Sequence, residues 1–200
     1  MSLYDISNTA LVVALFLYIA AFISYAVVIT GRNFGEAEQR AERTARRARR
    51  AFAVAVAATV LHLVYFVVRW IASGHIPVHN LFEFMTFLSL MIGVAFLIIY
   101  RVYSKPLLGV FAQPMAFVIL GYAMAFPWEA QPLIPSLNSI WLYIHVTLAA
   151  AGEAFFAIAF AAGLMYVLRV IDYTGKNERG QRIAVDFMLF AVLCLVGFVV

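Results

Sequence analysis

The residues best suited to chemistry in this sequence are its 4 histidines. His62 lies inside an apolar run, whereas His75, His79 and His145 lie at or near the ends of such runs. Imidazole can ligate haem iron and can shuttle protons near neutral pH. The histidines therefore indicate iron binding or proton transfer as the chemistry to consider first.

His145 lies four residues after Trp141, which on a helix is a rise of about 6 Å. Ala149 and Gly152 follow at i+4 and i+7, so the helix face beyond the imidazole is nearly flat. Such a face could receive a planar porphyrin, or it could pack closely against another helix through its small residues. The spacing leaves both interpretations open.

His75 and His79 are four residues apart, a spacing that places two metal ligands on one face of a helix. Pro77 between them breaks helical geometry, so the two rings need not converge. The stretch SGHIPVHN instead predicts an ordered turn that ends at Asn80, a favourable N-cap. Glu83 would then lie in the first helical turn, where the helix dipole favours a carboxylate.

His62 and Glu153 fall near the middle of apolar segments. An acidic group at the centre of a membrane helix costs about 2.5 to 3.5 kcal/mol on insertion scales, so such residues are functional candidates. One hypothesis is that Glu153 belongs to a proton relay or is a partner of His62. The alternative is that each forms a hydrogen bond to a neighbouring helix.

The composition places the chain in a membrane. Hydrophobic residues make up 66% and charged residues 12%, against about 45 to 50% and 25% in soluble domains. The net charge of +4 comes from loop arginines and does not indicate nucleic-acid binding. The single cysteine, Cys194, excludes a dithiol reductant and a Cys-x-x-Cys-His haem attachment within this chain.

Apolar segments of near-spanning length predict an all-α polytopic transmembrane bundle of about six spans, because backbone polar groups in lipid need partners within the helix. We expect one membrane domain over residues 1–200, as the N-terminal part of a longer protein, with the first segment retained as a helix. The segments are Asn8–Thr30, Ala51–Ala72, Leu81–Tyr100, Leu107–Phe126, Trp141–Arg169 and Ile183–Val200.

The positive charges predict the orientation. All 14 lysines and arginines except Arg69 fall on one side of the predicted bundle, which the positive-inside rule makes cytoplasmic. The basic loop over 32–50 is then cytoplasmic, and the N-terminus and all 3 tryptophans lie at the outer side. We expect this loop to be helical, because Glu36 and Arg40, and Glu42 and Arg46, are spaced i to i+4 as in helical ion pairs. One helix face then either contacts anionic lipid headgroups or only anchors the topology, and it carries Arg43, Arg46, Arg47 and Arg50.

Two stretches resemble the CcsA (ResC) type family of cytochrome c biogenesis proteins. RWIASGHIPVHNLFEFMTFLSL, from Arg69 to Leu90, is similar to the family's RW-x-x-S-G-H-x-P-L-S-N-L-Y-E-S text. PLIPSLNSIWLYIHV, from Pro132 to Val146, is similar to its P-L-V-P-A-L-Q-S-x-W-L-x-x-H-V segment. Both matches fall at the corresponding loop-to-helix junctions.

The resemblance implies a haem chaperone or one component of a cytochrome c synthase, with no catalytic residue of its own in this chain. Such a protein would hold haem b non-covalently at the outer face of the bacterial inner membrane, working with a CcsB/ResB-type membrane partner and apocytochrome c. His145 would be an axial ligand of the haem iron. Four further residues are implied at the cofactor site: His75, Arg69, Glu83 and Trp141. Arg69 could meet a haem propionate.

The sequence also departs from the family. His79 and Phe84 each stand where serine is usual, and Glu153 stands where tyrosine is common. The Trp-rich W-G-x-x-W-x-W-D stretch and the family's later histidines are absent from these 200 residues. Two other functions stay open: a proton-coupled transporter of a small solute with Glu153 and His62 as the coupling pair, and a haem-bearing electron-transfer subunit.

Overall fold

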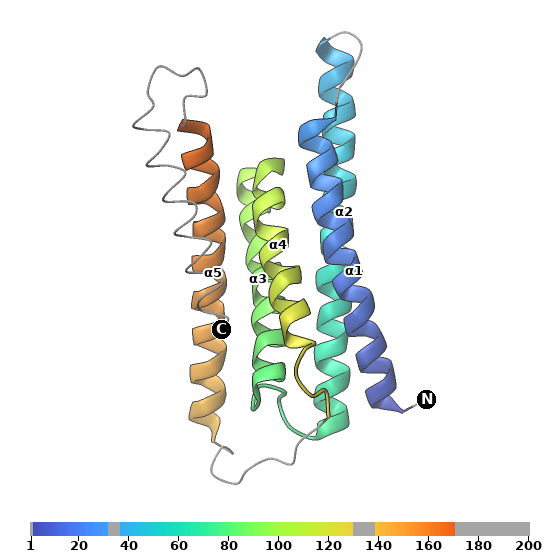
Figure 1. Cartoon of the computed structure of the whole chain (residues 1–200), viewed down its shortest axis with the longest axis vertical. Coiled ribbons are helices and arrows are strands. Elements are labelled where there is room, and N and C mark those ends of the chain that lie inside the picture. The colour runs from blue at the N-terminus through green and yellow to red at the C-terminus, as the bar shows by residue number, and fades with distance from the viewer. Residues whose placement is uncertain (1, 32–36, 130–138, 171–200) are drawn as a thin grey trace.

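A computed structural model shows the chain as a bundle of long helices (Figure 1). It describes residues 2–31, 37–129 and 139–170. All 5 helices in these ranges are long and apolar enough to cross a membrane, and the ranges contain no strand. The chain is therefore an integral membrane protein of the predicted all-α class. The helices are α1 (Leu3–Thr30), α2 (Ala37–Ser73), α3 (Leu81–Tyr103), α4 (Pro106–Ala123) and α5 (Ile140–Val170).

The predicted sixth span, Ile183–Val200, lies outside the described residues. The other five predicted segments each correspond to a helix, with boundaries set by local capping. α1 begins at Leu3, earlier than the predicted Asn8, because Ser2 and Asp5 form a capping box. The Asp5 backbone N–H donates to the Ser2 hydroxyl at 3.1 Å, and the Ser2 N–H donates to the Asp5 carboxylate at 2.7 Å.

A left-handed residue and a proline separate α3 from α4. Ser104 has φ 50°, and its N–H donates to the Tyr100 carbonyl at 2.8 Å, which ends α3. Pro106 then occupies the first position of α4, where its missing N–H is not needed. These two helices therefore form a tight antiparallel hairpin.

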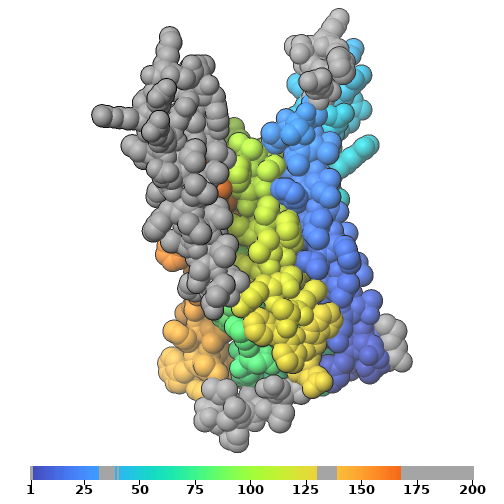
Figure 2. Space-filling model, viewed as in Figure 1, coloured from blue at the N-terminus to red at the C-terminus, as the bar shows by residue number. Residues whose placement is uncertain are grey.

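Each helix packs against the next one along the chain, and α3 is the most deeply buried of the described helices. α1 packs along α2 and also contacts α4, while α3 contacts α2, α4 and α5 (Figures 1 and 2). We call the end where α1, α3 and α5 begin the lower end, as it lies in Figure 1, and the opposite end the upper end. Trp70, Trp128 and Trp141 all belong to segments at the lower end, as predicted.

Close approach between helices depends on two glycines in the core. A Cβ atom added to Gly93 on α3 would lie 2.5 Å from the Tyr18 hydroxyl of α1 and 3.0 Å from the Thr59 hydroxyl of α2. A Cβ atom on Gly109 of α4 would meet the ring of Tyr25 of α1. Since only hydrogen fits at these positions, the tyrosines of α1 can lie directly against the backbones of α3 and α4.

The basic segment before the second apolar run is helical, as predicted. It forms the first turns of α2, which extends above the upper end of α3 and α4 (Figure 1). Glu42 and Arg46 form the expected i to i+4 ion pair at 3.2 Å, with both side chains exposed. Glu36, in the other expected pair, lies outside the described residues.

Candidate functional site at the lower end of the bundle

A buried ion pair joins α2 to α3 at the lower end. Arg69 is 0% exposed and Glu83 is 1% exposed, and the Arg69 Nη2 lies 3.6 Å from the Glu83 Oε1. The same Nη2 donates to the Trp128 carbonyl at 2.9 Å. The guanidinium also lies 5.0 Å from the ring centre of Phe82 and 5.9 Å from that of Tyr4. One arginine thus connects α1, α2, α3 and the segment after α4.

Glu83 is bound on both of its sides. Its Oε2 accepts a hydrogen bond from the His79 backbone N–H at 3.1 Å, and its own N–H donates to the Asn80 side chain at 2.8 Å. Asn80 is therefore the N-cap of α3, as predicted. The Glu83 carboxylate thus accepts a hydrogen bond from the preceding loop and pairs with Arg69. Its place in the first turn of α3 is also favoured by the helix dipole.

The loop between α2 and α3 brings two histidine rings together. Gly74, with φ 75°, turns the chain out of α2, a conformation that suits glycine. The ring centres of His75 and His79 lie 4.8 Å apart, so the rings converge although Pro77 separates them. Within the described ranges, no third histidine, cysteine or carboxylate completes a metal-binding group with them.

His79 also connects this loop to α5. Its Nε2 lies 3.1 Å from the Tyr143 hydroxyl, and the two rings are 5.3 Å apart. Burial lowers the pKa of His79 below its ordinary value, and neighbouring His75 lowers it further, although Glu83 acts in the opposite direction. The imidazole is therefore neutral at pH 7 and can share a hydrogen bond with the phenol.

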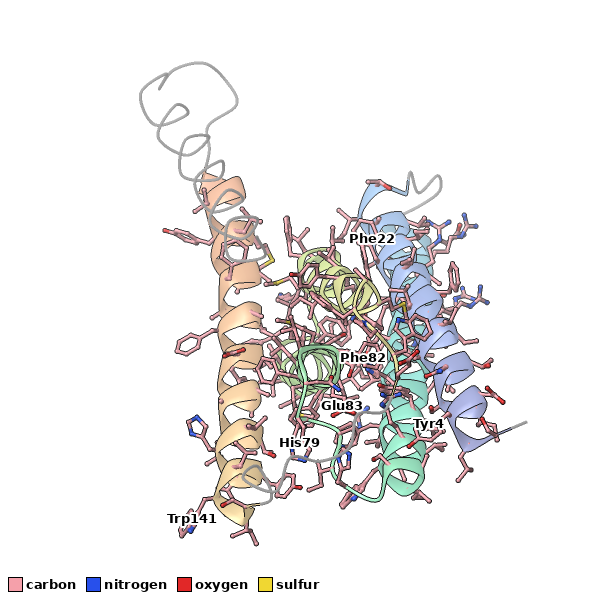
Figure 3. All side chains as sticks on the ribbon, turned by 60° about the horizontal axis from the view of Figure 1, so that its bottom comes forward. Tyr4, Phe22, His79, Phe82, Glu83 and Trp141 are labelled. Carbon is pink, nitrogen blue, oxygen red and sulfur yellow. The ribbon has the colours of Figure 1, made fainter. Side chains whose placement is uncertain are left out.

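His145 lies on the opposite face of α5 from this network. Its side chain is exposed, as is that of Trp141 four residues earlier, which points away from the other helices (Figure 3). A Cβ atom added to Gly152 would meet nothing within 4 Å. The described helices thus do not pack closely at Gly152, so the helix surface about two turns beyond the imidazole is open among the described residues. An exposed imidazole next to such a surface fits an axially bound porphyrin.

His62 and Glu153 do not meet. His62 on α2 is fully buried, and its Nδ1 lies 3.4 Å from the Tyr18 hydroxyl of α1, which is the interhelical hydrogen bond predicted as the alternative. Glu153 is exposed on α5. The hypothesis that they pair was therefore wrong. The alternative function of a proton-coupled transporter loses its coupling pair for the same reason. Residues of α2 and α5 are kept apart because α3 lies between these helices.

Sequence reasoning missed two members of this cluster, Tyr143 and Trp128. Tyr143 carries the link to His79, and the Trp128 carbonyl receives Arg69. The first had a visible signal, a phenol near the end of a predicted span, where tyrosine commonly places its hydroxyl in a polar layer. The second had none, because a backbone carbonyl is identified as an acceptor only once the fold is known.

Part of this chain is similar in sequence to known proteins. Residues 78–199 match the family described as "Cytochrome C assembly protein". The relatives include "Cytochrome c biogenesis protein CcsA" of Prochlorococcus marinus (strain MIT 9303), 41% identical over 98 residues, which are 47% of this chain and 30% of the relative. The proteins of the same name from Synechococcus sp. (strain WH7803) and Pyropia yezoensis are 32% and 34% identical over 121 residues, 58% of this chain. The matched stretches span about a third of these relatives' length, 35% and 37% in the last two.

Proposed function

This chain belongs to the cytochrome c assembly protein family, and from that premise we propose that it acts in cytochrome c maturation. In this role it would hold haem b non-covalently at the outer face of the bacterial inner membrane and present it to apocytochrome c. The observation that carries the proposal is the exposed imidazole of His145 near the start of α5.

His145 would ligate the haem iron, and the surface formed by Ala149 and Gly152 would lie beside the porphyrin. Exposed Trp141 adds an aromatic ring one helical turn before the ligand. Bound haem supplies the vinyl groups that form thioether bonds with the cysteines of the apoprotein. This chain's own part would be to bind and orient haem, because the cysteine thiols of the apoprotein are themselves the groups that add to the vinyls.

Arg69, Glu83 and His75 would act by position and not by contact with haem. The guanidinium of Arg69 is enclosed and paired with Glu83, which supports a structural role over propionate binding. The ion pair holds α2 against α3, and the hydrogen bond between His79 and Tyr143 holds α5 against the loop before α3. The helix carrying His145 is thereby fastened at its lower end.

The orientation follows from the charges. With the arginine-rich start of α2 in the cytoplasm, the lower end faces outward, where apocytochrome c is matured. The family relationship supports a CcsB/ResB-type membrane partner, which would complete the assembly around α5. The exposed Glu153 is consistent with such a contact, because a carboxyl group facing lipid is costly.

The proposal is tested by the absorption spectrum of the protein purified from its native membrane. His145→Ala should remove or shift the Soret band of bound haem, while the helical circular dichroism stays unchanged. His62→Leu is the matched control: it removes a histidine that is buried elsewhere and should leave the spectrum intact. A His145→Ala protein with the wild-type haem spectrum would overturn the assignment.

A further inference from the structure

The upper end of the bundle carries a hollow whose lining is entirely basic. It has a volume of about 390 Å³ and is lined by Arg43, Arg46, Arg47 and Arg50. These residues are spaced three, four and seven apart on α2, so they share one helix face. The four arginines therefore line one space.

The start of α2, residues 37–50, carries an excess of positive charge. Residues 37–50 contain six arginines and two glutamates, and Glu42 is already paired with Arg46 at 3.2 Å. The four lining arginines lie within about 10 Å along the helix axis. Like charges at this spacing destabilise a helix, and a bound anion would reverse that effect.

The position of the hollow identifies the kind of anion. Arg50 precedes Trp70 by 20 residues on α2, a distance of about 30 Å, which equals the hydrocarbon thickness of a bilayer. Tryptophan prefers the membrane interface. With Trp70 at one interface, the lining arginines lie in the headgroup layer of the other, where lipid phosphates are concentrated.

The end of α1 lies at the same level. The Tyr4 hydroxyl donates to the Ala72 carbonyl at 3.0 Å, which aligns the start of α1 with the end of α2. At the other end of this pair, a Cβ atom added to Gly31 would lie 2.8 Å from the Arg47 Nη1. The exposed apolar side chains of Val27 and Ile29 lie four and two residues before Gly31, at a level where lipid acyl chains would begin.

We propose that this hollow binds the phosphate of an anionic phospholipid headgroup. Guanidinium groups donate paired hydrogen bonds to phosphate oxygens, and several arginines on one face give the site more than a single contact. The neighbouring apolar surface of α1 favours a lipid over a free phosphate ion. This inference is independent of the proposed haem function, because it concerns the opposite end of the molecule.

The test is a binding titration of the purified full chain in nanodiscs of phosphatidylcholine, using fluorescent phosphatidylglycerol as the probe. The variant Arg46→Gln/Arg47→Gln removes two charges from the hollow. The matched control, Arg49→Gln/Arg101→Gln, removes two exposed charges that do not line it. At about fivefold per arginine, we expect the hollow variant to bind the probe about 25-fold more weakly and the control less than twofold.

Two results would overturn the inference. Equal weakening in both double variants would show that only net charge matters. Displacement of the probe by millimolar inorganic phosphate from wild type but not from the hollow variant would assign the hollow to a free anion. The substituted residues on α2 and α3 are exposed or partly exposed, so circular dichroism should report folded protein in every case.

Discussion

Replacing Arg69 by methionine should destabilise the protein strongly, because it would leave the Glu83 carboxylate buried without its counter-charge. At 3.6 Å and an effective dielectric constant of about 20, the attraction between the two charges is about 4 to 5 kcal/mol. Breaking one side of a buried pair typically costs about 3 to 5 kcal/mol. We therefore expect Arg69→Met to lower the free energy of unfolding by about 3 to 5 kcal/mol.

Removing both charges should cost much less than removing one. In Arg69→Met/Glu83→Gln no charge stays buried, and the glutamine oxygen can still accept the His79 N–H that Glu83 accepts at 3.1 Å. The loss is then the hydrogen bond to Trp128 and some packing, about 1 to 2 kcal/mol. The double variant should be more stable than the single Arg69→Met variant.

The measurement is unfolding of the protein in mild micelles by added sodium dodecyl sulfate, followed by far-ultraviolet circular dichroism. Arg101→Met is the control, since Arg101 is an exposed arginine near the end of α3 and its loss should change stability by less than about 0.5 kcal/mol. The reasoning fails if Arg69→Met unfolds like Arg101→Met, or if the double variant is less stable than Arg69→Met.

Two further predictions concern packing and pH. Gly93→Ala should lower the free energy of unfolding by about 1 to 3 kcal/mol in the same assay, because its methyl group would lie 2.5 Å from the Tyr18 hydroxyl. Adding Tyr18→Phe should recover part of this lost stability. Gly163→Ala is the control and should not destabilise the protein, because a Cβ atom there meets nothing within 4 Å. Because the pKa of His79 is lowered in the folded protein, the unfolded chain takes up this proton at a higher pH than the folded chain does. The stability of the wild type should therefore fall as the pH drops below about 6.5 and stay constant above it. His79→Ser should make that dependence less steep, and an unchanged slope would contradict the assignment.

The all-α membrane architecture could be predicted from the sequence because it depends on local properties. Runs of apolar residues set the helices, and charged loops set the expected orientation. The N-cap at Asn80 and the ion pair between Glu42 and Arg46 were equally predictable, because both join residues within one helical turn. The start of α1 was misplaced, because the residues of its capping box, Ser2 and Asp5, are polar and lie before the apolar run. The end of α4 was also misplaced, since this helix ends at Ala123 and not at the predicted Phe126.

The partners of the polar residues were decided by the tertiary structure. Arg69 and Glu83 could each be noted as unusual in the sequence, but their ion pair depends on how the end of α2 meets the start of α3. Likewise, the convergence of His75 and His79 depends on a loop conformation that Pro77 made hard to foresee.

The sequence by itself determined that this protein is a helical membrane bundle with three of its 4 histidines near one end, because helix formation in lipid requires only local hydrogen bonds. The tertiary structure decided which faces those residues present. Helix rotation fixed His145 on the exposed side of α5, Tyr143 against His79, and His62 in the core away from Glu153. A rotation of one helix about its axis changes every such contact but leaves the hydrophobic pattern that predicts the helix unchanged.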